Sequence, residues 1–279
     1  MNKTAINGII MFSVKHPHRS NVKNVFAPNY MEYRIKIFRE VTLKSLANQT
    51  DMDFNVFVLH SDDAPQSYKD IFGDMEKEFP FIRNVWLKDF DDPYAMPGVS
   101  DVAFENDVTI SFRVDNDDGL PVEFIKNLRG FLRPEFSGFC INWPKITVAQ
   151  RIARDKYMAT EFDFIMNSIG LAYVAARRDN KNIMNLRNHA TVRFKAPTVL
   201  LPGMGGLQII NGENVLNRMW RRGKKYSGAE IAEYLRIAGY ANTDLSILKI
   251  TRVQLAKHGG PIGRLLFHIG KMFRKIMYK

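Results

Sequence analysis

The stretch TISFRVDNDDGLP at residues 109–121 joins a predicted buried strand to an abrupt cluster of negative charge. Its apolar residues alternate, as expected of a β-strand, at Ile110, Phe112 and Val114. Carboxylates follow within four positions, at Asp115, Asp117 and Asp118. Carboxylates this close together repel one another, so the stretch predicts a strand end that faces a positively charged partner.

The segments around this stretch alternate between strand and helix patterns. Strands are predicted at residues 5–14, 54–60, 81–87 and 108–114, and helices at residues 30–46, 66–79 and 122–132. This order predicts an α/β fold with a mostly parallel sheet and helices on both faces. Ligands of such sheets bind at the carboxyl ends of the strands, where residues 61–63 and 115–118 both fall.

The second half of the chain is less regular. Residues 138–144 and 171–177 have strand patterns, and residues 200–214 combine another strand with the sequence GMGG, interpreted as a flexible loop. Ser227-Gly228-Ala229-Glu230 has the pattern of a capping box, which predicts a helix at residues 228–238. We interpret residues 1–245 as one domain and residues 246–279 as a tail.

The composition, with 46% apolar and 25% charged residues among 279, is typical of an ordinary globular protein. Cys140 is the only cysteine, which excludes a disulfide framework and a Cys-based zinc site and predicts a reducing, cytoplasmic compartment. The apolar run near the start is too short and too interrupted for a signal peptide or a membrane anchor.

The tail carries most of the positive charge: eight of the net eleven charges follow Asp244, after which no acidic residue occurs. Within residues 260–279 apolar residues recur roughly every 3.5 positions, with basic residues mostly opposite. This pattern predicts a basic amphipathic helix that lies in an anionic membrane surface; the alternative is a terminal helix packed on the domain. Because the charge is concentrated there and no nucleic-acid-binding motif occurs, no nucleic-acid partner is expected.

The acidic cluster has the composition of a metal site. Asp115 and Asp117, separated by one residue of a strand, are predicted to point to the same side and to converge on one cation. Hard oxygen ligands suit Mg²⁺ or Mn²⁺, which complete their coordination shell with phosphates and water. His189 is a candidate third ligand or acceptor contact. The alternative is a solvated turn; an EF-hand is excluded by the position of Gly119.

Several motifs together resemble the putative rhamnosyltransferase family of bacterial GT-A-type glycosyltransferases. They span about residues 9–218 and read IMFSV, TLKSLANQTDMDF, VFVLHSDD, SFRVDNDDGLP, INWP and GGLQIINGENVLNR. The resemblance implies a GT-A-like (Rossmann-like) fold. It also implies transfer of a sugar, rhamnose by family name, from a nucleoside-diphosphate donor to a surface glycan such as a capsule or lipopolysaccharide chain. The sequence departs from the family at Asn211, where relatives carry His.

The resemblance assigns roles to the candidate residues. Asp115 and Asp117 would hold Mn²⁺ or Mg²⁺, which neutralises the leaving diphosphate. Candidate contacts to the nucleotide sugar are Arg34, Ser61, Asp62, Arg113 and Asp118. Candidate bases for the acceptor hydroxyl are Glu213 and Asp163. Purely structural roles are the alternatives: an ion pair with Asp115 for Arg113, a solvated or salt-bridged position for Arg34, turn contacts for Ser61 and Asp62, and a structural role for His189.

These expectations describe a cytoplasmic enzyme on the inner face of the cell membrane that acts on a glycan or a lipid-linked glycan. Two alternatives use the same features. A metal-dependent phosphohydrolase or nuclease would use the carboxylates without a sugar acceptor. A non-catalytic membrane- or nucleic-acid-binding protein would need the basic charge alone.

Overall fold

The computed structural model describes residues 5–14, 26–88, 107–163, 167–176, 179, 181–186, 189–211 and 223–251. The amphipathic helix predicted at residues 260–279 and the candidate base Glu213 lie outside these ranges. No helix within them is long and apolar enough to cross a membrane.

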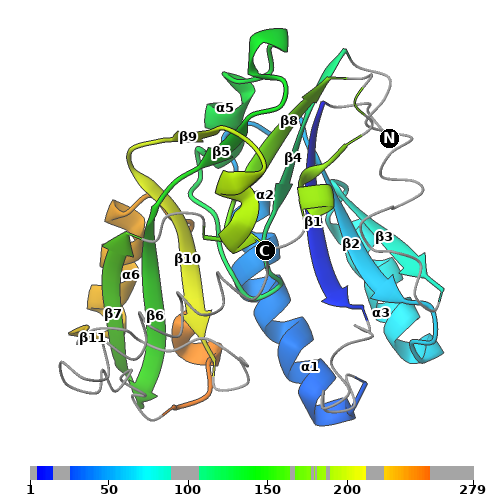
Figure 1. The fold of residues 1–279 in the computed structure, drawn as a ribbon. Coiled ribbons are helices and arrows are strands. Elements are labelled where there is room, and N and C mark those ends of the chain that lie inside the picture. Colours follow the sequence, from blue (N-terminus) through cyan, green and yellow to red (C-terminus); the bar gives the residue numbers. More distant parts are fainter. Residues whose placement is uncertain are drawn as a thin grey trace, which may run out of the picture.

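A seven-stranded sheet forms the larger layer of the molecule (Figure 1). Its strands stand in the order β3 (Ile82–Leu87), β2 (Asn55–Ser61), β1 (Ile6–Ser13), β4 (Val108–Arg113), β8 (Ala172–Ala176), β5 (Cys140–Asn142) and β9 (Thr198–Leu200). The first four strands in this order are parallel, whereas β8 runs antiparallel to both β4 and β5. The predicted α/β class is confirmed, and the carboxyl ends of β1, β2 and β4 share one edge.

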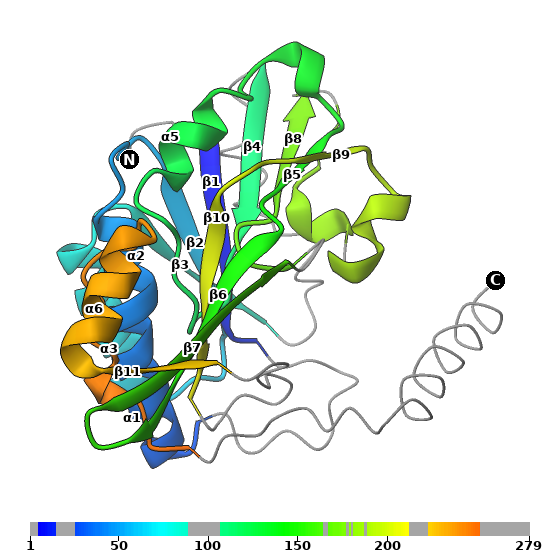
Figure 2. The ribbon, with the colours of Figure 1, turned by 90° about the vertical axis from the view of Figure 1, so that its left-hand side faces the viewer.

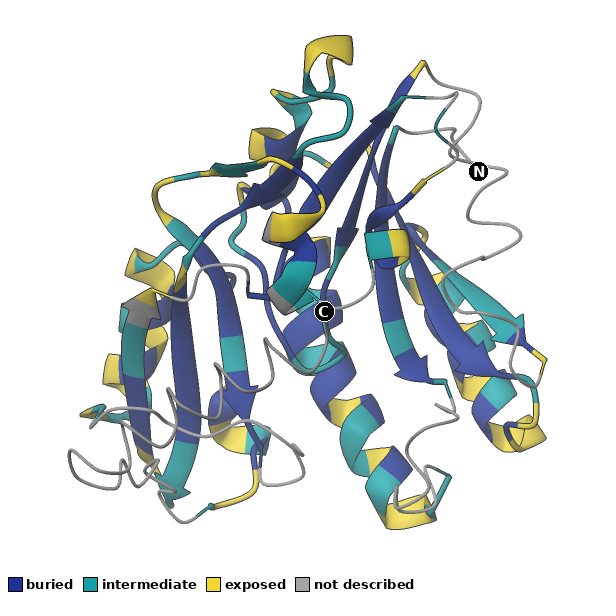
Figure 3. Ribbon diagram, in the orientation of Figure 1, coloured by how far each residue is buried: buried dark blue, intermediate teal, exposed yellow. Residues whose placement is uncertain are grey.

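Helices cover both faces of this sheet, as predicted, but they differ in kind. On one face lie α1 (Pro28–Ile37), α3 (Gln66–Glu78) and α5 (Phe124–Arg129), whose apolar side chains join those of the strands in the main core. On the other face lie the short 3-10 helices η4 (Ile183–Leu186) and η5 (His189–Phe194). The central strands β1, β2 and β4 are accordingly almost entirely buried, whereas the edge strands β3 and β9 are partly exposed (Figure 3). The covering by η4 and η5 was not predicted from the sequence.

A second, four-stranded sheet was not predicted. Its strands stand in the order β10 (Met204–Ile210), β6 (Lys145–Ala153), β7 (Lys156–Asp163) and β11 (Lys224–Ser227). The helix α6 (Gly228–Ile237) packs on it (Figure 2). This helix starts at the predicted capping box: the backbone N–H of Glu230 donates to Ser227 Oγ, and the backbone N–H of Ser227 donates to Glu230 Oε2.

The interpretation of GMGG as a flexible loop is wrong, because most of it is the packed start of β10. A Cβ atom on Gly205 would lie 2.3 Å from the Cβ of Trp143, and one on Gly206 would lie 2.2 Å from the Cγ2 of Ile169. Both glycines therefore permit close packing of the strand. The next residue of β10, Leu207, forms an isolated bridge with Gly119 in the segment that follows the acidic cluster.

The first helix lies between the two sheets (Figure 1). It runs from α1 through the π-helical turn η1 (Phe38–Leu43) into α2 (Lys44–Ala47), which confirms the helix predicted at residues 30–46. Phe38 packs in the core of the seven-stranded sheet, whereas Ile37 and Val41 pack in the core of the four-stranded sheet. A helix buried on two sides explains why its apolar residues are spread around its circumference.

Candidate functional site

The acidic cluster forms a turn after β4 and not the end of the strand. β4 ends at Arg113, and the backbone N–H of Asp118 donates to the carbonyl oxygen of Asp115 at 3.2 Å. The strand therefore ends before the carboxylates. The prediction that Asp115 and Asp117 converge because they occupy alternate positions of one strand is wrong. The turn nevertheless brings Asp115 and Asp117 close enough for each charge to act on the other.

The carboxylates of this turn are poorly neutralised. Burial, and then the charge of Asp115, raise the pKa of Asp117 to about 7. Arg34 opposes this shift, as does the hydrogen bond from Asn211 Nδ2 to Asp117 Oδ2 at 3.1 Å. Burial and the two neighbouring carboxylates raise the pKa of Asp118 well above its ordinary value. Asp118 is only 1% exposed, and its Oδ1 accepts no hydrogen bond from the described part of the chain.

Arg113 and His189 lie beside the turn. Arg113 Nη2 is 3.5 Å from Asp115 Oδ1, so the predicted ion pair is present. Burial and the positive charge of Arg113 lower the pKa of His189, whereas Asp115 raises it. The fold thus brings His189 near the acidic turn from η5, as a neutral imidazole at physiological pH.

Arg34 reaches the same region from α1. Its guanidinium carbon lies 4.7 Å from the ring centroid of Phe12 and 5.3 Å from that of Tyr30, and its Nη2 donates to the Phe12 carbonyl oxygen. Burial lowers the pKa of Arg34, while Tyr30 and Asp117 raise it. The side chain is therefore a half-buried, fixed cation within electrostatic reach of the acidic turn, in contrast to a solvated surface arginine.

Ser61 and Asp62 lie at the predicted edge of the sheet and already have side-chain partners. Ser61 Oγ donates to Asp63 Oδ1 at 2.6 Å, and Lys69 Nζ of α3 donates to Asp62 Oδ1 at 3.3 Å. The contact of Ser61 is the turn contact that the sequence offered as the alternative. A contact of either residue with a nucleotide sugar stays a prediction.

Asp163 is not brought to the acidic turn. It is exposed at the end of β7, opposite Lys145, which in turn pairs with Met204 at the start of β10. Asn211, which contacts Asp117, follows the other end of β10. Asn211 lies seven positions along the chain from Met204, a span of roughly 23 Å in a strand.

The turn suits a cation that binds together with a phosphate. No group of three or more His, Cys, Asp or Glu side chains in the described ranges is arranged to hold a metal ion. Asp115 and Asp117 offer two hard oxygen ligands, and Asp118 Oδ1 is a buried acceptor without a donor. Mg²⁺ and Mn²⁺ usually bind through one or two carboxylates and take their other ligands from phosphate and water. The donor set therefore fits such an ion.

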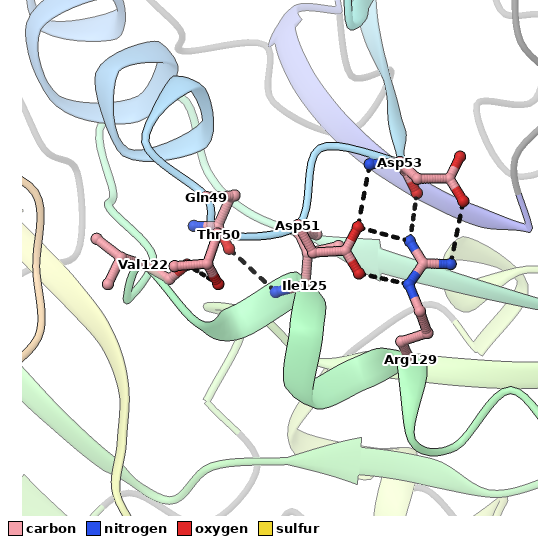
Figure 4. A network of polar contacts seen from close by, with 7 residues as sticks. All are labelled: Gln49, Thr50, Asp51, Asp53, Val122, Ile125 and Arg129. Carbon is pink, nitrogen blue, oxygen red and sulfur yellow. Dashed lines mark hydrogen bonds and ion pairs between the residues drawn. The ribbon is translucent and has the colours of Figure 1, made fainter.

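Polar side chains of the first helix and of the loop after it bind the segment that follows the acidic turn. The sequence analysis did not predict this role. Thr42 Oγ1 donates to the carbonyl oxygen of Asp118 at 2.8 Å, and Ser45 Oγ accepts from the backbone N–H of Leu120 at 3.2 Å. Further along, Gln49 and Thr50 bind the backbone of residues 121–125, and Asp51 and Asp53 pair with Arg129 (Figure 4). Thr and Ser are unusual inside a buried helix, and their presence there could have indicated that these side chains bind neighbouring backbone.

The motif TLKSLANQTDMDF therefore holds the chain after the turn. Over residues 8–222 the chain matches the model of a family described as putative rhamnosyl transferase. The chain belongs to this family. The resemblance seen in the motifs is thereby confirmed over nearly the same range. The mostly parallel sheet covered on both faces agrees with the predicted α/β class.

Solved structures with a similar fold are distant. TarS from S. aureus shares 14% identity at a TM-score of 0.41, with 84% of this chain and 38% of that chain covered. TarS 1–349 in complex with UDP shares 14% identity at a TM-score of 0.38, with 75% of this chain and 61% of that chain covered. A putative glucose-1-phosphate thymidylyltransferase from Bacillus anthracis in complex with a sucrose shares 8% identity at a TM-score of 0.31, with 87% of this chain and 99% of that chain covered. The chain thus spans less than two thirds of either TarS structure, and no curated protein matches it.

Proposed function

We propose that the protein is a metal-dependent glycosyltransferase whose acidic turn binds Mn²⁺ or Mg²⁺ together with the diphosphate of a nucleotide-sugar donor. One observation carries the proposal: Asp117 and Asp118 are held beside Asp115 with raised pKa values, and Asp118 Oδ1 has no donor within the described residues. Crowding of this kind destabilises a fold unless a bound cation favours the charged carboxylates. Family membership supplies the class of reaction.

In this proposal the residues of the turn divide the work. Asp115 and Asp117 are the ligands, and the bound ion supplies the positive charge that a departing diphosphate requires. Arg34, fixed against two rings, and Arg113 add positive charge for phosphate oxygens. Asp118 Oδ1 accepts a hydrogen bond from a hydroxyl of the donor sugar.

The acceptor side is proposed from the sequence. His189 is a third ligand or an acceptor contact, and Glu213 is the candidate base, because the fold does not bring Asp163 to the turn. The acceptor is a surface glycan or a lipid-linked glycan, and rhamnose is the sugar that the family description names.

Residues 260–279 attach the enzyme to the anionic inner face of the membrane in this proposal. It rests on the run of basic residues that follows Asp244. Sedimentation with anionic vesicles, with and without these residues, tests it: equal binding of both forms would contradict this part.

A thermal-shift screen tests the core of the proposal. Nucleoside diphosphates and nucleotide sugars are added with and without Mn²⁺ to the wild type, to Asp117→Asn, and to Asp74→Asn, a matched change at an exposed carboxylate of α3. We expect one nucleotide to stabilise the wild type and Asp74→Asn in the presence of Mn²⁺, and not to stabilise Asp117→Asn. Stabilisation that is indifferent to Mn²⁺, or sugar transfer undiminished by a chelator, would remove the metal. Phosphate release without an acceptor would favour the phosphohydrolase.

A further inference from the structure

A π-helical turn interrupts the first helix next to the acidic turn. In η1 the helix widens, and the backbone N–H of Lys44 reaches the carbonyl oxygen of Arg39, five residues earlier. Such turns are rare and are frequent at functional sites. Relative to an α-helix the wider turn adds about one residue, which rotates the side chains that follow it by roughly 100°.

A polar row of side chains in and after the wide turn contacts the chain that follows the acidic turn. Thr42 and Ser45 begin the row, and Ser45 Oγ also donates to the carbonyl oxygen of Thr42 at 2.8 Å. Gln49 continues it, donating to the carbonyl oxygen of Pro121 at 2.8 Å. The first helix and the loop after it therefore present apolar residues to two cores and polar residues to a single segment of backbone.

The bond between Thr42 and Asp118 is shielded from water on all sides. Thr42 is 0% exposed and Asp118 is 1% exposed. From the side of β10, Gly119 and Leu207 exchange two backbone hydrogen bonds of 2.8 Å each. Residues 118–120 are thus held by η1 and α2 on one side and by β10 on the other, directly after carboxylates that repel one another.

We propose that Thr42 is a positioning residue: its hydroxyl holds the backbone of Asp118 and so keeps the acidic turn in its ligand-binding arrangement against the mutual repulsion of its carboxylates. It touches neither donor nor acceptor and acts through the backbone of Asp118. The effect of Thr42 on metal and donor binding rests on the proposed function. The contact itself does not depend on that function.

Three variants isolate the hydroxyl. Thr42→Val keeps the shape and removes the donor, and Thr42→Ser keeps the donor. Thr50→Val is the matched control: its hydroxyl donates to the carbonyl oxygen of Val122 at 3.3 Å, and the backbone N–H of Thr50 reaches the same oxygen at 2.8 Å. Should Thr42→Val fail to fold, Thr42→Cys, which keeps the volume with a weak donor, takes its place.

The first measurement is the affinity for Mn²⁺ alone, from the spin resonance of the free ion. The second is amide hydrogen exchange at residues 118–120. For Thr42→Val we expect Mn²⁺ to bind about three- to tenfold more weakly, since one buried hydrogen bond is lost, and these amides to exchange faster. Thr42→Ser should recover both values, and Thr50→Val should leave both at the wild-type level.

Wild-type affinity and wild-type exchange in Thr42→Val would overturn the inference. If the wild type itself binds no Mn²⁺, the proposed function fails and hydrogen exchange alone decides. Faster exchange at residues 118–120 that Thr42→Ser reverses then supports the positioning role, and unchanged exchange refutes it.

Discussion

Two Asp-x-Asp strings in this chain have opposite electrostatic surroundings. In Asp51-Met52-Asp53 both carboxylates pair with Arg129, whose Nη2 donates to Asp51 Oδ1 at 2.9 Å and whose Nη1 lies 3.1 Å from Asp53 Oδ2 (Figure 4). The hydrogen bonds from Arg129 hold the pKa of Asp51 below its ordinary value. In Asp115-Asn116-Asp117, burial and like charge instead raise the pKa of Asp117 to about 7.

The difference lies in how closely the fold pairs the carboxylates with a cation. The first string fastens the loop after α2 to α5 with an arginine that comes from the chain itself, so nothing needs to bind there. Beside the second string, Arg113 lies 3.5 Å from Asp115 and Arg34 acts on Asp117, yet burial and like charge still raise the pKa of Asp117. The adjacent Asp118 keeps an acceptor without a donor among the described residues. The Asp-x-Asp string alone therefore indicates little, and the partner within reach decides between a structural pin and a ligand site.

Asparagine at each string should separate the two roles most sharply. Asp117→Asn should lower the affinity for Mn²⁺ and the rate of sugar transfer by at least about 100-fold, because a charged ligand is lost where charge must be neutralised. Asp51→Asn should leave both within about twofold of the wild type, since lost surface contacts act mainly on stability. Mn²⁺ titrations and transfer assays at 25 °C measure both quantities. Equal losses in the two variants would contradict the division into a ligand site and a structural ion pair.

Removal of Arg129 should act on stability and not on metal binding. Arg129→Met should lower the free energy of unfolding by about 0.5–2 kcal/mol, because two carboxylates lose a charge-assisted partner whose contribution is weakened by partial exposure to water. Arg129→Lys should lose roughly half as much, as an ammonium group cannot match the forked geometry. Urea unfolding measures both. Stability unchanged in Arg129→Met would mean that the network in Figure 4 contributes nothing.

The pH dependence of stability should also differ between the strings. An unfolded Asp loses its proton near pH 4, whereas folded Asp117 keeps it until about pH 7, so stability without metal should fall as the pH rises across this window. Asp117→Asn should therefore be more stable than the wild type at pH 8 by on the order of 1 kcal/mol, a value discounted for partial exposure, and the difference should shrink towards pH 5.

Asp51 should show the opposite sign. Its pKa is lowered, so its contribution is present above about pH 4 and is lost only as the pH falls further. The stability difference between Asp51→Asn and the wild type should therefore be constant from pH 5.5 to pH 8. Urea unfolding at several pH values, with a chelator present, measures both variants. A difference that follows the pH in Asp51→Asn, or none that does so in Asp117→Asn, would contradict the contrast.

The parts that were predictable from the sequence were those with local periodicity. The parallel strands of the first half carry dense apolar runs, and the capping box at Ser227 is a four-residue pattern, so both were found. β6 and β7 escaped because β6 interleaves polar residues and its parallel partner, β10, lies far along the chain. The roles of Thr42 and Arg129 depend on contacts across more than seventy residues, which one sequence does not reveal.

The smallest expected effect concerns Asn211, the position where the family resemblance implies a His. Asn211 is 4% exposed, and its Nδ2 donates to Asp117 Oδ2 at 3.1 Å. An imidazole there would face the proposed ligand, and imidazole nitrogen suits Mn²⁺ better than Mg²⁺. Asn211→His should therefore bind Mn²⁺ a few-fold more tightly and leave Mg²⁺ affinity nearly unchanged. Asn211→Ala, which removes the donor that favours the charged carboxylate, should weaken both at pH 7. An unaltered ratio of Mn²⁺ to Mg²⁺ affinity in Asn211→His would place this side chain outside the coordination sphere and leave it only the task of orienting Asp117.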